Sequence, residues 1–172
     1  ISGNGTILGG AGDDVISSLG DNTSIDGGDG SDDITVMPGG IAHGGNGGDL
    51  ILGALSGTDT LDGGADSDHI IGRGADDSID GGGDFDSLEG GAGNDSIRGG
   101  AGWDNIDGGD GTDTVYMSGN RADYTVAAAG EWLTITDNRS GSPDGTDTLR
   151  NVEFIAFADQ TVKTDIPGGD GK

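Results

Sequence analysis

The sequence contains no cysteine among its 172 residues, so it can form neither a disulfide framework nor a zinc site built on thiolates. Aromatic residues make up only 4% of the chain, and hydrophobic residues make up only 30%. No apolar run approaches the roughly 20 residues that a membrane-spanning helix requires. We therefore expect neither a disulfide-stapled domain nor a membrane span, and without further order this composition would indicate disorder.

Positive charge is also scarce, since Lys and Arg number 7 against 32 Asp and Glu, and the formal net charge is −25. Nucleic acid and anionic membranes repel such a chain, so we expect neither as a partner, whereas cations are natural partners. No signal peptide is visible, but the opening segment Ile1–Gly10 reads as the middle of a larger protein. We therefore expect attached domains in a longer chain.

Glycine is abundant instead, with 40 residues, and it recurs at a fixed period. The stretch GGAGNDSIRGGAGWDNIDGGDGTD, from Gly90 to Asp113, repeats the nonapeptide G-G-x-G-x-D-x-U-x, in which U is a large aliphatic residue. Units of nine residues follow one another without a gap from Gly63 to Tyr116. This run is too long and too regular to be a chance pattern.

The array before Gly63 is less regular but keeps the same phase. Three of its units fit the pattern in full, namely 9–17, 27–35 and 44–52. The unit 18–26 keeps only the length and the aliphatic residue. The unit 36–43 is one residue short and the unit 53–62 is one residue long, so the two irregularities cancel.

One aliphatic residue in nine gives no apolar stripe at the helical period, and paired glycines oppose a helix. The x-U-x piece can instead form a strand of about three residues, and the glycine-rich piece suits a tight turn. Strand, turn, strand and turn make a coil of 18 residues. Stacked coils form two facing parallel sheets with the aliphatic side chains between them, so we predict an all-β parallel β-roll, a β-solenoid.

The quoted units resemble those of the RTX, or hemolysin-type calcium-binding, nonapeptide repeat proteins, and the resemblance extends from about Ile7 to Tyr116. It implies a right-handed parallel β-roll with Ca²⁺ bound between neighbouring turns on one edge. It also implies a secreted bacterial protein, exported by type I secretion. Such arrays are attached to proteases, lipases, epimerases, toxins and adhesins, and this sequence does not choose among them.

The residues themselves also favour calcium, because carboxylates and carbonyls are hard oxygen ligands. Asp86 and Asp104 are 18 residues apart, so they stack one coil apart, at about 4.8 Å. Two charges at that spacing repel by roughly 0.9 kcal/mol even in water. We therefore expect the fold to depend on bound cations.

Alternate units share an edge of the roll. On the first edge the sixth position is acidic in every unit: Asp14, Asp32, Asp49, Asp68, Asp86 and Asp104. On the second edge it is Thr23, a disrupted loop near Ala42, and then Asp59, Asp77, Asp95 and Asp113. A site needs two adjacent loops, so we predict five intervals on the first edge and three on the second, or about eight Ca²⁺.

The predicted ligands are the ten aspartates of these positions and the glycines whose carbonyls are free to turn toward an ion. These glycines are Gly9, Gly10, Gly12, Gly27, Gly28, Gly30, Gly90, Gly91, Gly93, Gly99, Gly100, Gly102, Gly108, Gly109 and Gly111. The alternative, solvated turn residues, is favoured only for the loop near Pro38. A further set follows the aliphatic position and is expected to form an acidic rim: Asp26, Asp62, Asp80, Glu89 and Asp107.

The nonapeptide pattern ends at Tyr116. We therefore divide the chain into a roll at 1–116, a β-rich cap at 117–163 and a linker or tail at 164–172. Within the cap we predict strands at 123–128, 132–137 and 152–158, with turns at 128–131 and 140–145. Three acidic residues of the cap are close in sequence and form either a polar turn, the favoured interpretation, or a further calcium site: Asp137, Asp144 and Asp147.

We predict no enzyme in this segment, although a longer protein can carry one. Its histidines are His43 and His69, and it has neither an H-E-x-x-H nor a G-x-S-x-G motif. The function we predict is that of a monomeric calcium-binding module that folds outside the cell or at its surface. It would stabilise attached domains or assist their export. The alternative is an extracellular recognition module of an adhesin or a polysaccharide-modifying enzyme, which binds polysaccharide or another surface ligand.

Two aromatic residues bear on that alternative, because Phe85 and Trp103 occupy the fifth position of neighbouring first-edge units. They should therefore lie one coil apart on the same edge. One interpretation is that the cap folds back over them and buries them. The other is that they remain exposed as a platform for a sugar ring or a partner domain.

Overall fold

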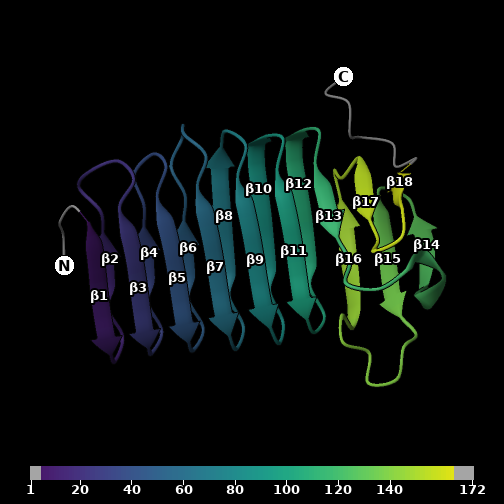
Figure 1. Cartoon of the computed structure of the whole chain (residues 1–172), viewed down its shortest axis with the longest axis horizontal. Coiled ribbons are helices and arrows are strands. Elements are labelled where there is room, and N and C mark those ends of the chain that lie inside the picture. Colours follow the sequence, from purple (N-terminus) through teal and green to yellow (C-terminus); the bar gives the residue numbers. More distant parts are fainter. Residues whose placement is uncertain (1–4, 165–172) are drawn as a thin grey trace.

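The computed structural model describes residues 5–164, and in this range the chain forms two 9-stranded sheets and one short 3₁₀ turn. The sheets face each other along the length of the molecule, and the coils stack in chain order from the N-terminal end to the cap (Figure 1). The predicted all-β, parallel β-roll is therefore confirmed. Within the described range no helix has the length and apolar character needed to cross a bilayer.

The strands alternate between the sheets. In spatial order, the first sheet contains β1 (Thr6–Ala11), β3 (Ser24–Asp29), β5 (Ile41–Asn46), β7 (Thr60–Ala65), β9 (Ser78–Gly83), β11 (Ser96–Ala101), β13 (Thr114–Tyr116), β17 (Phe154–Ala156) and β18 (Thr161–Lys163). The second contains β14 (Tyr124–Ala129), β15 (Trp132–Asp137), β16 (Thr146–Arg150), β12 (Asn105–Gly111), β10 (Ser87–Gly93), β8 (His69–Gly74), β6 (Leu50–Leu52), β4 (Asp33–Thr35) and β2 (Val15–Ser17).

The register follows the repeat. Ile7 pairs with Ile25 in the first sheet, which places equivalent positions of successive coils side by side. The short unit 36–43 shifts the next partner of Ile25 to Ala42, and the long unit 53–62 restores the phase by pairing Ala42 with Leu61. The predicted cancellation of the two irregularities is confirmed.

The core of the roll is a stack of aliphatic side chains between the sheets, one at the aliphatic position of each unit, with Val36 as an additional member. These residues are at most 5% exposed along the roll: Ile7, Ile16, Ile25, Ile34, Ala42, Ile51, Leu61, Ile70, Ile79, Leu88, Ile97, Ile106 and Val115. The stack continues into the cap through residues such as Leu149 and Ile155. Each side chain removes apolar surface from water only if the next coil is in place.

Several strands are longer than the three residues expected from the x-U-x piece. The prediction holds for β2, β4, β6 and β13, but all the other strands of the roll have six or seven residues. The extension arises because glycines also pair between coils, as Gly91 does with Gly109. Gly109 has φ of 102°, and a Cβ there would overlap the carbonyl oxygen of Gly91, so only glycine permits this close stacking.

The cap combines a hairpin with one more coil of the roll. After the 3₁₀ turn η1 (Arg121–Asp123), β14 and β15 pair antiparallel, whereas β16 runs parallel to β12 and β17 runs parallel to β13. The predicted strands correspond to β14, β15 and β17, but β16 and β18 were not predicted. Figure 1 shows the cap at one end of the stack, in green and yellow. Residues 1–4 of the predicted roll and 165–172 of the predicted tail lie outside the described range.

Candidate metal centres

The first edge consists of loops that each begin one strand of the second sheet, and their aspartates form a continuous ladder. The backbone N–H of each aspartate donates to Oδ1 of the aspartate one coil later, as Asp68 does to Asp86 at 2.9 Å. The same bond links every neighbouring pair from Asp14 to Asp104. The structure therefore brings all six predicted residues of this edge together.

The second edge forms the same ladder over part of its length. The N–H groups of Asp59, Asp77 and Asp95 donate to the next aspartate at 2.8 Å. The earlier turns differ, because Gly40 rather than an acid precedes Asp59 in the ladder. Thr23 also carries no carboxylate, and its hydroxyl donates to the carbonyl of Gly20 at 2.7 Å.

In most ladder aspartates the second carboxylate oxygen is buried and has no hydrogen-bond partner. This holds for Oδ2 of Asp32, Asp49, Asp68, Asp77, Asp86, Asp95, Asp104 and Asp113, all at most 3% exposed. Within residues 5–164, no ion pair reaches any of these side chains. Because a buried, unpaired carboxylate is unfavourable by several kcal/mol, these oxygens are suited to a bound cation.

The first glycine of each unit allows these oxygens to meet a carbonyl from the next coil. A Cβ on Gly63 would lie 2.6 Å from the carbonyl oxygen of Gly81 and closer still to Oδ2 of Asp68. The same convergence occurs at Gly27, Gly44, Gly81 and Gly90. Carboxylate and carbonyl oxygens are the hard donors that Ca²⁺ prefers.

The electrostatics of the ladder also favour a cation. Burial, opposed in part by the backbone hydrogen bond and reinforced by the neighbouring carboxylates, raises the pKa of Asp68, Asp77, Asp86 and Asp113 to about 7. Burial likewise raises the pKa of Asp49, Asp95 and Asp104. Burial in the ion-free fold thus favours protonation of these carboxylates, and a divalent cation can provide the same neutralisation.

Two predicted ligands differ from the rest. Asp14 starts the ladder and is partly exposed, and among residues 5–164 no preceding turn donates an N–H to its carboxylate. Both carboxylate oxygens of Asp59 accept protein hydrogen bonds, from Gly40 N–H at 2.8 Å and from Ala54 N–H at 2.7 Å. In the longer unit 53–62, backbone N–H groups therefore provide hydrogen bonds to both carboxylate oxygens of Asp59.

Most of the predicted glycines lie in the later half of a strand, and only Gly12, Gly30 and Gly102 lie in the loops that follow. The fourth position of the unit has positive φ in Gly12, Gly30, Gly93, Gly102 and Gly111. Three units keep this conformation without glycine, at Asp66, Ala75 and Asp84, with φ between 71° and 76°. Sequence reasoning missed these positions, because it matched residue types. Their place as the fourth residue of a nine-residue unit is the signal that could have identified these three residues.

Two cap residues that we did not predict as ladder members continue the ladders. Asp147 accepts the N–H of Asp104 at 3.1 Å, and Glu153 accepts the N–H of Asp113 at 2.7 Å. Burial and the Asp104 carboxylate raise the pKa of Asp147 to about 8. The sequence DGTD, from 144 to 147, repeats the x-G-x-D of a unit, and that signal could have found Asp147.

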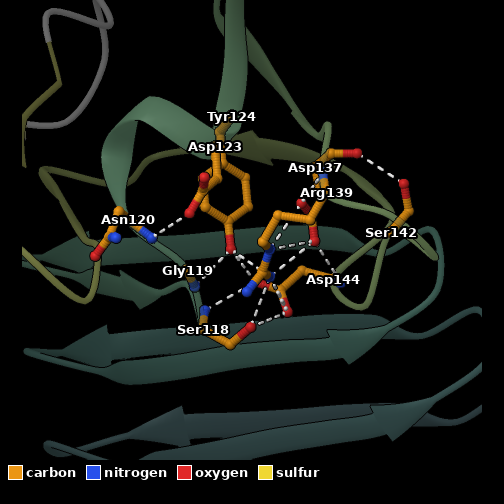
Figure 2. Close-up of polar contacts among 9 residues, drawn as sticks. All are labelled: Ser118, Gly119, Asn120, Asp123, Tyr124, Asp137, Arg139, Ser142 and Asp144. Atoms are coloured by element: carbon orange, nitrogen blue, oxygen red, sulfur yellow. Dashed lines mark hydrogen bonds and ion pairs between the residues drawn. The ribbon is translucent and has the colours of Figure 1, made fainter.

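The other two acids of the cap belong to a separate polar network (Figure 2). Figure 2 shows Arg139 between Asp137 and Asp144, with ion pairs of 2.7 and 3.2 Å, and Tyr124 bonded to Asp144. The Arg139 guanidinium lowers the pKa of Asp137 to about 2. Arg139 pairs with both of these carboxylates, whereas Asp147 belongs to the first-edge ladder. The three acids therefore do not share one site, and the polar-turn interpretation describes Asp137 and Asp144.

The acidic rim is exposed or half-buried and partly paired with basic side chains. His43 Nδ1 lies 2.9 Å from Asp62, Arg98 lies 3.6 Å from Asp80, and Arg150 pairs with Asp107. Within the described range no three His, Asp or Glu side chains cluster as a compact metal site. The oxygen donors are instead distributed along the edges, with two carboxylates and loop carbonyls at each step.

Comparison with known families supplies independent support for this arrangement. The RTX calcium-binding nonapeptide repeat matches in 4 copies, over residues 1–34, 54–88 and 80–115. These ranges cover more than half of the chain and include most of the ladder loops. Comparison with curated proteins gives no match. The stacked coils, the aspartate ladders and this match together show that the chain belongs to the RTX calcium-binding nonapeptide repeat family.

Proposed function

We propose that this chain is a calcium-folded module whose two edges bind about eight Ca²⁺, one at each interval between adjacent ladder aspartates. The observation that carries the proposal is the set of eight buried aspartate Oδ2 atoms without a partner. Five belong to the first edge and three to the second, as many as the intervals on each edge. Bound calcium would supply the positive charge that the chain lacks.

Calcium would decide whether the roll forms at all. The core holds one aliphatic residue per unit, and the formal net charge is −25. Stacking the coils without ions places like charges one strand spacing apart along both edges. Because the binding loops exist only in the stacked roll, the free energy of ion binding becomes free energy of folding.

We further propose that the module works outside the cell or at its surface. Extracellular calcium modules have dissociation constants of roughly 10⁻⁴–10⁻³ M, which separates the calcium-rich exterior from a calcium-poor cytosol. Membership of the RTX family is consistent with secretion by bacteria. The chain would then pass through a secretion channel unfolded, fold on release, and stabilise attached domains.

Circular dichroism during a calcium titration tests the proposal. The chain in chelator should give a largely disordered spectrum, and β structure should rise with Ca²⁺. Mg²⁺ is the control and should substitute poorly, because its small octahedral shell does not suit an array of protein carbonyls. A strong β spectrum in chelator that calcium leaves unchanged would contradict the proposal.

A second candidate function is recognition of a neutral polysaccharide, favoured by an aromatic groove beside the cap. Phe85 and Trp103 are 54% and 72% exposed, so the interpretation that the cap buries them is wrong. With Trp132 they line an open groove of about 410 Å³ that also includes Asn105 and Thr148. Aromatic faces with flanking polar groups suit a sugar ring, and the acidity of the chain disfavours anionic glycans.

The substitution Trp103→Ala tests this second function. We expect loss of binding to neutral polysaccharides on a glycan array in calcium, with an unchanged melting temperature, because the side chain is exposed. Leu55→Ala is the matched control, since Leu55 is 82% exposed and lies outside the groove. Absence of glycan binding by the unaltered protein would rule the candidate out.

A further inference from the structure

We propose that the cap completes a further calcium site on the second edge, between Asp113 and Glu153. The inference rests on the proposed calcium function, but it concerns a cap residue beyond the nonapeptide array and beyond the matched ranges. It assigns Glu153 as the acidic ligand that closes the ladder.

The strand register places Glu153 at the ladder position. β17 runs parallel to β13, with Phe154 beside Thr114 and Ile155 beside Val115. Glu153 therefore precedes its strand as Asp113 precedes β13. The backbone of the cap reproduces the end of a repeat unit here, although the sequence does not repeat.

The hydrogen bonding of Glu153 matches that of the aspartates. The N–H of Asp113 donates to Oε2 of Glu153 at 2.7 Å, which is the bond that links successive ladder aspartates. The other oxygen, Oε1, is buried and without a partner, as is Oδ2 in the eight aspartates. Asp113 itself is 0% exposed, and its own Oδ2 is among those unpartnered atoms.

A carbonyl from the cap also occupies the place of a repeat carbonyl. In the preceding coil, the oxygens around Gly90 are Oδ2 of Asp95 and the carbonyl of Gly108. Around Gly108 they are Oδ2 of Asp113, at 2.7 Å from a Cβ, and the carbonyl of Asn151, which is closer still. The donor set of a repeat interval is thus rebuilt with one carbonyl and one carboxylate from the cap.

Chain geometry explains why the acid is glutamate. Asp107 pairs with Arg150 and Thr114 pairs with Phe154, so a six-residue segment of the repeat faces a three-residue segment of the cap. The shorter segment cannot bring the backbone as far into the loop, and one additional methylene extends the carboxylate. Asn151 turns the chain with φ of 49°, and its side-chain amide donates to Asp107 at 2.7 Å.

The first edge ends differently. Asp147 accepts the N–H of Asp104, but it is not among the residues with an unpartnered buried oxygen. The three atoms closest to a Cβ on Gly99 all belong to Asp104, and none is a carbonyl oxygen of the cap. The geometry therefore assigns the additional site to the second edge.

The test uses Glu153→Gln in the full chain, with calcium counted by native mass spectrometry at saturation. The amide oxygen can still accept the N–H of Asp113, while the charge is lost. We expect one bound ion fewer than in the unaltered protein. Glu131→Gln, in the exposed turn of the cap hairpin, is the matched control and should leave the count unchanged. An unchanged count in Glu153→Gln overturns the proposal.

A crystal structure of the calcium-loaded, unaltered protein keeps the proposal falsifiable if Glu153→Gln does not fold. An ion in contact with the Glu153 carboxylate supports the site, and ions along the array with none at Glu153 overturn it. A protein that binds no calcium at all would instead overturn the proposed function. The two failures are therefore distinguishable.

Discussion

The two edges of the roll share one backbone register but differ in how their loops are satisfied. On the first edge every loop carries an aspartate, and the ladder runs unbroken from Asp14 to the cap. On the second edge the first turns have Thr23 and Gly40 at the ladder positions, and protein N–H groups bond both oxygens of Asp59. The stacked backbone thus does not itself require acids, and the proposed calcium dependence would arise where acids replace internal hydrogen bonds.

The largest effect expected from this comparison is a dependence of the ion-free fold on pH. The pKa of Asp68, Asp77, Asp86 and Asp113 is about 7 in the fold and about 3.8 in the unfolded chain. The folded state thus binds more protons between these values, and the stability present below pH 3.8 is lost as pH rises through 7.

In chelator we therefore expect β structure to increase as pH falls from 8 to 4, measured by circular dichroism. Acid would act in place of calcium by neutralising the ladders. The control is the calcium-saturated protein, whose spectrum should change little from pH 8 to pH 6. Ion-free samples with the same β content at pH 8 and pH 4 would show that ladder charge does not limit folding.

A smaller effect is expected from single substitutions on the two edges. Asp86→Ala removes a carboxylate shared by two intervals and leaves the N–H of Asp68 without an acceptor. We expect the free energy of unfolding in calcium to fall by roughly 3–5 kcal/mol, together with a lower ion count. Chemical denaturation and native mass spectrometry measure the two quantities.

Thr23→Val is the second-edge counterpart of that substitution. It removes one hydroxyl bond to Gly20, so the expected loss is about 1 kcal/mol with no change in ion count. Equal losses of bound ions in Asp86→Ala and Thr23→Val would show that the assignment of sites to the edges is wrong.

An effect smaller than that of Asp86→Ala separates glycines that make room for ligand oxygens from those that do not. In Gly63→Ala the new Cβ would contact Oδ2 of Asp68 and the carbonyl of Gly81, and we expect a loss of about 1–3 kcal/mol in calcium. Gly83→Ala is the control, because the nearest atom would be 3.9 Å away. Thermal denaturation in calcium measures both, and equal melting temperatures would contradict the proposed role of Gly63.

The sequence alone predicts the roll well, because each residue contacts mainly its own equivalent one coil away. The nine-residue period is therefore sufficient to pair Ile7 with Ile25 and to separate the two edges. The cap has no such internal copy. Glu153 reaches the ladder through a short turn without a glycine pair, so only the strand register places it there. The exposure of Trp103 depends on the cap stacking on the end of the roll, which no local pattern specifies.

The ladder bond between successive aspartates points one way, from the N–H of one loop to the carboxylate of the loop that follows it in the chain. The aspartate ladder therefore has a direction, because each coil depends on the following coil for its hydrogen-bond acceptor. Deleting coils from the N-terminal end leaves the N–H of every remaining ladder aspartate with its acceptor. Deleting the cap leaves the N–H groups of Asp104 and Asp113 without acceptors. For the aspartate ladders, loss of the cap is therefore more costly than loss of coils at the beginning of the array.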